Sequence, residues 1–356
     1  MSDTQWLYRL DELGSEHNEI VGKKCAQLGE MTRAGFRVPP GYALSLEAYG
    51  RFMNESGAIS EVRNYLNDFN ADPNDPADLP KYDKTSKVVR AILENKAMPA
   101  DMAELIGRHY DELCRTAGVP DVSVATRSAG PSSHPGQYET FLHVRGKTDL
   151  MKNIVKVWSS TFNQRSIHMR HRLGLPLDWD PIGVAVLKMV NAKAAGVMFT
   201  LNPANGDRSK IIIQGNWGLG ESVVSGSVTP DEWIVDKVVL EISHRTISFK
   251  NTICMFDEHS GKVRMQEMPP ERQAVACLTD DEIIEIAAIG KRLEQHYGVP
   301  QDIEWTIDAD LAFPMNIFLV QTRPETIWSK KKAPSKLKTT GSSEGDVIQF
   351  YRDLKA

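Results

Sequence analysis

The chain has 356 residues, of which 41% are hydrophobic and 25% are charged, the usual balance of a soluble globular protein. The net charge of −5 provides no overall basic field and so disfavours nucleic acid as the main partner. The N-terminal segment lacks the apolar core of a signal peptide, and the most apolar stretch, 181–200, is interrupted by Lys188, Asn191 and Lys193. These features predict no membrane span and a cytoplasmic protein.

The cysteines are widely separated and form no CxxC pair. This pattern favours a reducing compartment and argues against a zinc site.

The first half of the chain predicts a helical lobe. Cys25, Leu28 and Met31 lie at helical spacing before Gly35, and Ser45 is placed to start a second short helix. Further predicted elements are helices over 86–97, 99–117 and 148–172, a strand over 122–126 and a Gly-, Pro- and Ser-rich loop over 127–137.

After Pro181 the pattern changes to short β-rich runs separated by turn signals, which predict a mainly antiparallel sheet. Thr279 and Glu282 have the spacing of a capping box that starts one helix. We therefore expect a helical α/β lobe over 1–180, a β-rich lobe over 181–328, and a basic linker and tail over 329–356.

Two neighbouring strands near the end carry polar residues on an inward face. In "FLVQTRPET", Gln321 and Arg323 share one face of a strand that ends at Pro324, and in "QDIEW", Glu304 stands between Ile303 and Trp305. An unpaired buried glutamate is costly, so a structural Glu304–Arg323 salt bridge is one interpretation. The other interpretation is a Mg²⁺ site in which Glu304 and Gln321 are ligands and Arg323 contacts the phosphates that Mg²⁺ carries. The residues alone do not choose between them.

Two further residues suit phosphate binding. Lys24 falls in the first turn of a helix, where anions are favoured, but on local grounds a surface lysine is the better interpretation. Arg127 enters a loop that can present backbone N–H groups to phosphate, and plain turn chemistry explains that loop equally well.

Six motifs occur in an order that resembles a known family: "GKKCAQLGEM…GFRVPPGYALS", "TRSAG…GQYETFLHV", "AAGVMFTLNP", "GLGESVVSGSVTPDEW", "QDIEW" and "VQTRPET". Over roughly residues 14–328 the chain resembles the N-terminal nucleotide-binding domain of phosphoenolpyruvate synthase, pyruvate phosphate dikinase and rifampin phosphotransferase. The resemblance implies an α+β ATP-grasp fold that holds ATP between two lobes.

The resemblance also assigns roles to residues of this chain. It implies that the metal ligands are Glu304 and Gln321, that the catalytic residues are Arg127, Glu304 and Arg323, and that Mg·ATP contacts the set Lys24, Arg127, Gly136, Thr140, Glu304, Gln321 and Arg323. Two positions depart from the family pattern: Lys23 replaces the first glycine of a GGK segment, and Leu187 replaces a glutamine near the nucleotide.

No segment resembles the phosphohistidine domain of these enzymes. The resemblance therefore implies an ATP-binding subunit that phosphorylates or pyrophosphorylates a histidine on a partner subunit, with AMP and phosphate released overall. Phenylphosphate synthase, an enzyme of phenol metabolism, is divided into subunits in this way. The alternatives are the ATP-binding part of a phosphoenolpyruvate synthase or rifampin phosphotransferase-like enzyme, and a non-catalytic ATP-sensing module.

Overall fold

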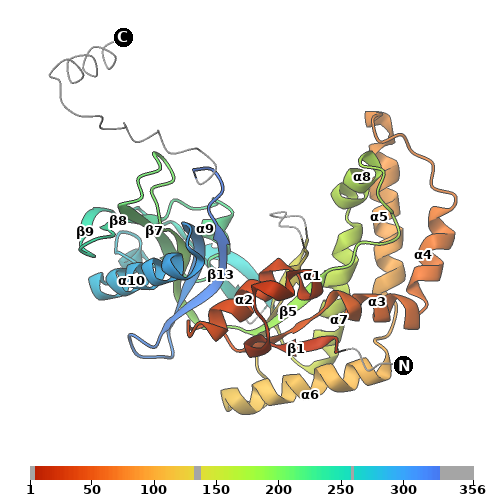
Figure 1. Ribbon diagram of the computed structural model, residues 1–356, viewed down its shortest axis with the longest axis horizontal. Helices are drawn as coiled ribbons and strands as arrows, with labels where there is room; N and C mark the ends of the chain where they lie inside the picture. The colour runs from red at the N-terminus through yellow and green to blue at the C-terminus, as the bar shows by residue number, and fades with distance from the viewer. Residues whose placement is uncertain (1–4, 132–137, 258–259, 329–356) are drawn as a thin grey trace, which may run out of the picture.

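The computed structural model describes residues 5–131, 138–257 and 260–328, which form helices and antiparallel sheets in two lobes (Figure 1). This arrangement confirms the expected α+β fold. The first sheet has the order β1 (Leu7–Arg9), β2 (Gly41–Leu44), β5 (Gly183–Lys188), β3 (Val124–Ala129), β4 (Thr140–Val144). The second has the order β13 (Ile317–Pro324), β12 (Gln301–Asp308), β6 (Ala192–Phe199), β7 (Lys210–Trp217), β8 (Asp231–Asp236), β9 (Ile242–Thr246).

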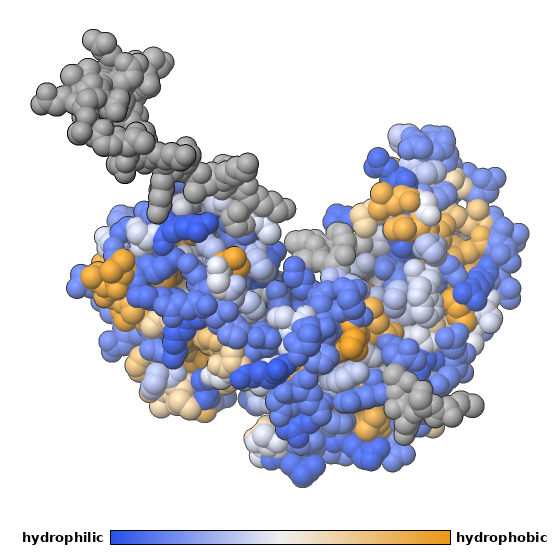
Figure 2. Space-filling view, viewed as in Figure 1, coloured by the Kyte–Doolittle hydropathy of each residue, from blue (hydrophilic) through white to orange (hydrophobic). Residues whose placement is uncertain are grey.

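A helical arm projects from the first lobe (Figure 1). It consists of α4 (Ala58–Leu66), α5 (Leu79–Glu94) and α8 (Gln164–Arg172). The surface is hollowed between this arm and the lobe of the second sheet (Figure 2).

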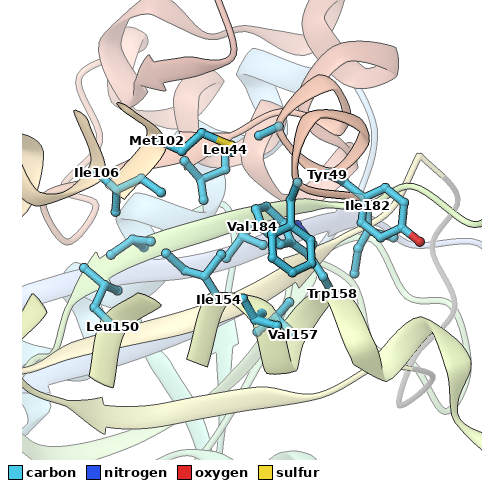
Figure 3. Close-up of a cluster of buried hydrophobic side chains, with 14 of the residues drawn as sticks. Leu44, Tyr49, Met102, Ile106, Leu150, Ile154, Val157, Trp158, Ile182 and Val184 are labelled. Atoms are coloured by element: carbon cyan, nitrogen blue, oxygen red, sulfur yellow. The ribbon is translucent and has the colours of Figure 1, made fainter. Parts of the chain in front are cut away.

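The core of the first lobe lies between its sheet and three helices, α3 (Leu46–Glu55), α6 (Ala100–Ala117) and α7 (Lys147–Ser159). Figure 3 shows side chains of these helices, among them Tyr49, Ile106 and Trp158, packed with Leu44 and Val184 of the sheet. Every side chain named here is fully buried, so apolar burial holds these helices on the sheet.

The second sheet is covered on one face by α10 (Asp280–Tyr297), through buried residues such as Ile283, Ile286 and Leu293. The capping box expected at its start is present, because the Thr279 hydroxyl accepts from the Glu282 N–H and Glu282 accepts from the Thr279 N–H. A separate hairpin of β10 (Thr252–Asp257) and β11 (Lys262–Glu267) joins this lobe through a backbone bridge from Cys254 to Gly218. The short α9 (Glu221–Val224) lies beside that bridge.

Several predicted boundaries are wrong. The strand expected over 122–126 runs to Ala129, so Arg127 lies within a strand and not in a loop. The helix expected over 86–97 begins at Leu79 and ends at Glu94. The helix expected over 148–172 is interrupted by η4 (Ser160–Phe162), because Asn163 adopts an extended backbone and its side chain caps α8 by accepting from the Ser166 N–H.

The strand that follows residue 180 belongs to the first lobe. β5 pairs with β2 and β3, so the change from one sheet to the other falls between β5 and β6. The expected tail over 329–356 lies outside the described residues. Within the described part of the chain, no helix is both long and apolar enough to cross a bilayer.

The helix α2 (Lys23–Arg33) packs against both lobes. Its buried residues Cys25, Leu28 and Met31 belong to one core cluster with residues of β5 and of the second sheet. Gly22 precedes it with φ +80°, and a Cβ at this position would lie 1.9 Å from the Ala129 carbonyl oxygen. Only glycine therefore allows the start of α2 to lie against the end of β3. The remaining short helices are α1 (Asn18–Val21), η1 (Leu10–Glu12), η2 (Ser15–His17), η3 (Pro76–Asp78) and η5 (Pro270–Arg272).

Candidate functional site

Arg127 of β3 joins the two lobes. Its Nη2 donates to Glu304 Oε2 at 3.3 Å and to Gln321 Oε1 at 3.2 Å, and Gln321 Nε2 donates to Glu304 Oε1 at 3.0 Å. Glu304 and Gln321 stand directly opposite each other on β12 and β13, as their shared inward face predicts. The Arg127 and Glu304 side chains are only 16% and 20% exposed, so the pair is largely shielded from water.

A β-bulge provides Arg127 with a third partner. Glu304 pairs with Gln321, but the next residue, Trp305, pairs with Leu319, which leaves Val320 as the extra residue. The Val320 carbonyl accepts from Arg127 Nη1 at 2.7 Å. The sequence contains no signal for this acceptor, because a bulge depends on the pairing of two strands.

Lys24 lies in the first turn of α2 near this cluster. Burial, together with the positive charges of Arg127 and Arg323, lowers the pKa of Lys24 to about 8, and the Glu304 carboxylate only partly opposes this shift. A half-buried ammonium group within the electrostatic influence of two guanidinium groups is an unfavourable arrangement that an anion would relieve.

Arg323 pairs with a residue that the sequence interpretation missed. Its guanidinium donates to Asp302 Oδ2, with the Nε atom at 2.7 Å and the Nη2 atom at 2.6 Å. The structural alternative of a Glu304–Arg323 salt bridge is therefore wrong: Glu304 pairs with Arg127, and Arg323 pairs with Asp302. Asp302 could have been found, because it lies two residues before Glu304 and so on the same face of β12.

Burial raises the pKa of Asp302, an effect that Arg323 opposes and that the nearby Glu304 and Glu325 carboxylates reinforce.

The other expected residues are placed as follows. Thr140 begins β4 directly opposite Arg127, so the two side chains share a face of the first sheet. Gly136 lies outside the described residues. Leu187 is buried in β5 within the apolar core.

Gln321 and Glu304 are cross-strand neighbours, and the line of neighbours that they begin continues across the second sheet. Val197, Gln214 and Glu232 follow on β6, β7 and β8, and Gln214 Nε2 donates to Glu232 Oε2 at 2.7 Å. This second carboxylate–amide pair lies on the face of the sheet that carries Glu304, opposite the face that α10 covers.

The oxygen atoms around Arg127 suit a hard cation. Glu304 Oε2 and Gln321 Oε1 both point to one guanidinium nitrogen, so a carboxylate and an amide oxygen already converge on a positive charge. These are the ligand types that Mg²⁺ prefers. Lys24, Arg127 and Arg323 provide positive charge of the kind that binds a polyphosphate.

The comparisons with known proteins indicate a nucleotide-binding domain. Residues 18–344 match the family model described as pyruvate phosphate dikinase, AMP/ATP-binding domain. The chain belongs to this family. The match confirms the expected resemblance to the N-terminal ATP-binding domain of the phosphoenolpyruvate synthase and pyruvate phosphate dikinase family. The two-lobed α+β architecture is of the ATP-grasp type.

The dikinase-type domain is also similar to curated proteins over most of its length. It is 36% identical to a probable phosphoenolpyruvate synthase of Staphylothermus marinus over 99% of this chain and 45% of the relative. The probable phosphoenolpyruvate synthases of Methanothermobacter thermautotrophicus and Methanocaldococcus jannaschii are 38% and 37% identical, each over 92% of this chain and over 47% and 27% of the relative. The domain therefore spans less than half the length of each of these relatives.

Proposed function

We propose that this chain binds Mg·ATP between its two lobes and uses it to phosphorylate or pyrophosphorylate a histidine on a partner chain or domain. The observation that carries the proposal is the convergence of Arg127, Glu304 and Gln321 from two lobes on one point, with Lys24 beside it. A match to an AMP/ATP-binding domain supports the nucleotide.

In this proposal each side chain has a separate task. Lys24, Arg127 and Arg323 neutralise charge on the phosphates, and Glu304 and Gln321 hold Mg²⁺, which when bound offsets the negative charge that develops during phosphoryl transfer. Thr140 contributes a hydroxyl on the face that Arg127 occupies. Catalysis would then rest on positioning and electrostatics.

A partner is proposed because the chain matches only part of each longer relative. The final acceptor depends on which member of the family the chain resembles in its division, and an antibiotic would be the acceptor in one like rifampin phosphotransferase. Phenol would be the final acceptor in an enzyme divided like phenylphosphate synthase, and pyruvate would be the acceptor in one like phosphoenolpyruvate synthase.

The test is transfer of label from ATP labelled at the β-phosphate. The chain is captured from its native cell with any associated protein, and the complex is incubated with labelled Mg·ATP. Acid-labile, base-stable label on a histidine of the partner, with AMP formed in step, is the expected result. Binding of ATP with no label on any captured partner would instead support an ATP sensor.

A further inference from the structure

The residues just before β4 connect the nucleotide site to the helical arm. Side chains alternate along an extended strand, so Thr140 faces the site while Glu139 faces the helices. Arg90 of α5 binds the Glu139 carboxylate with both terminal nitrogens, at 2.6 and 2.8 Å. This is the bidentate geometry that fixes both the position and the orientation of a carboxylate.

Neighbouring groups hold both members of this pair. The Glu139 N–H donates to the Ser160 hydroxyl at 3.1 Å, and Ser160 is fully buried at the end of α7. Arg90 also lies 3.5 Å from Glu94, one turn further along α5, and Glu94 accepts from the buried Ser159 hydroxyl at 2.6 Å. The Glu139 carboxylate and backbone are thus fixed to α5 and η4 independently.

Tyr138 makes a second connection. Its hydroxyl donates to Asp180 Oδ2 at 2.9 Å, and the same oxygen accepts from Arg170, which is 4% exposed. Arg170 donates further to the Thr161 and Leu177 carbonyls. Burial and the Asp180 carboxylate raise the pKa of Tyr138, so its hydroxyl stays a donor at neutral pH.

We propose that Tyr138 and Glu139 are positioning residues for the nucleotide site. They fasten the start of β4 to the helical arm and so hold Thr140 opposite Arg127. The inference rests on the proposed function, because it assigns these residues to the placement of groups that face the ATP phosphates. Within the described residues neither side chain forms a hydrogen bond or ion pair with the Arg127–Glu304–Gln321 cluster, so both act through β4.

Three variants test the proposal by binding alone. Glu139→Ala and Arg90→Ala each break the bidentate pair, and Tyr138→Phe removes one hydroxyl. Asp83→Asn is the matched control, since Asp83 forms an exposed ion pair with Lys87 on the same helix, α5, with no contact to residues 138–140. Affinities for Mg·AMPPNP and for adenosine are measured by calorimetry on each full-length protein, and folding is checked by the melting temperature.

We expect Glu139→Ala and Arg90→Ala each to weaken Mg·AMPPNP binding about tenfold. A double variant that carries both substitutions should bind Mg·AMPPNP as tightly as either single variant, because both substitutions remove the same Arg90–Glu139 pair. Adenosine should bind all variants as it binds the wild type, since in the proposed function the phosphates, and not the adenosine, face Thr140 and Arg127. Tyr138→Phe should weaken Mg·AMPPNP in the same selective way, and Asp83→Asn should change neither affinity.

Equal affinity of wild type and variants for Mg·AMPPNP would overturn the proposal. So would a parallel loss of adenosine binding, which would indicate a general structural defect. If the wild type itself binds neither ligand, it is the proposed function that fails, and this outcome is distinct from both of the others.

Discussion

At the scale of single residues, the site consists of charged side chains that hydrogen bonds and burial hold close together. Arg127 is held by a carboxylate, an amide oxygen and a backbone carbonyl, while Lys24 lies nearby with a lowered pKa. A polyphosphate would give these cations new partners, and a metal ion would take over the oxygens of Glu304 and Gln321. The fold therefore places positive and negative groups where a metal–nucleotide complex needs them.

Replacement of Glu304 by glutamine tests the metal assignment. Glu304→Gln keeps the size of the side chain but removes its charge and replaces one of the two oxygens that accept from Arg127 and Gln321 with an NH2 donor. We therefore expect AMP formation in the complete system to fall at least about 100-fold. Glu232→Gln is the matched control, because Glu232 also pairs with a glutamine on the same face of the sheet. Steady-state rates across a Mg²⁺ titration provide the measurement, and an unchanged rate in Glu304→Gln would exclude this residue as a metal ligand.

The lowered pKa of Lys24 predicts how nucleotide affinity depends on pH. Without ligand the pKa is about 8, and phosphate beside the ammonium group must raise it. Affinity for Mg·ATP should therefore be constant below pH 8 and then fall, by up to about tenfold per pH unit, until the pKa of the bound state is reached. Calorimetry at pH 8.5 in buffers of different ionisation enthalpy should detect proton uptake on binding. Lys24→Arg, which stays charged, should remove both the fall and the uptake; a wild type with no pH dependence would contradict the assignment.

At the scale of elements, features that depend on neighbouring residues could be predicted from the sequence, and features that depend on distant residues could not. The capping box at Thr279 and the shared face of Gln321 and Arg323 depend on a few adjacent residues, and both are confirmed. The hairpin of β10 and β11 went unpredicted, since its burial pattern shows no clean alternation.

Within the site, the residue types could be read from the sequence, but their partners could not. Arg127 and Glu304 are separated by 177 residues, so their pairing depends on how the lobes meet. Asp302 shares the face of Glu304, but the family pattern assigns a role only to Glu304, so the motif does not single out Asp302.

Because α2 starts in close contact with the end of β3, adding one methyl group at Gly22 should have a large effect on stability. Gly22→Ala would place a Cβ 1.9 Å from the Ala129 carbonyl oxygen at φ +80°, and we expect it to lower the free energy of unfolding by about 3 kcal/mol or more. The control is Gly57→Ala at φ +75°, where a Cβ meets nothing within 4 Å and the expected cost is only about 1 kcal/mol. Urea denaturation compares the two, and equal losses would mean that the close approach is relieved by a shift of α2.

At the scale of the whole molecule, ligand binding should stabilise the two lobes together. With Mg·ATP at 100 times its dissociation constant, the wild type should gain about 2.7 kcal/mol and show a raised melting temperature. Arg127→Ala should lose most of this gain, because it removes the side chain that reaches from β3 to both β12 and β13. Differential scanning calorimetry with and without nucleotide is the check; an undiminished gain in Arg127→Ala would place the nucleotide elsewhere.

The position of α2 has a consequence for dividing the chain. Residues of this helix are buried in a single core cluster with residues of β5, of β12 and of β13. Dividing the chain between β5 and β6 would place the two sheets on separate fragments. The buried surface of α2 would then lose its contacts with the second sheet. We therefore expect fragments that end or start near residue 190 to be unstable alone and to regain structure when mixed, as complementary halves of one cooperative unit would.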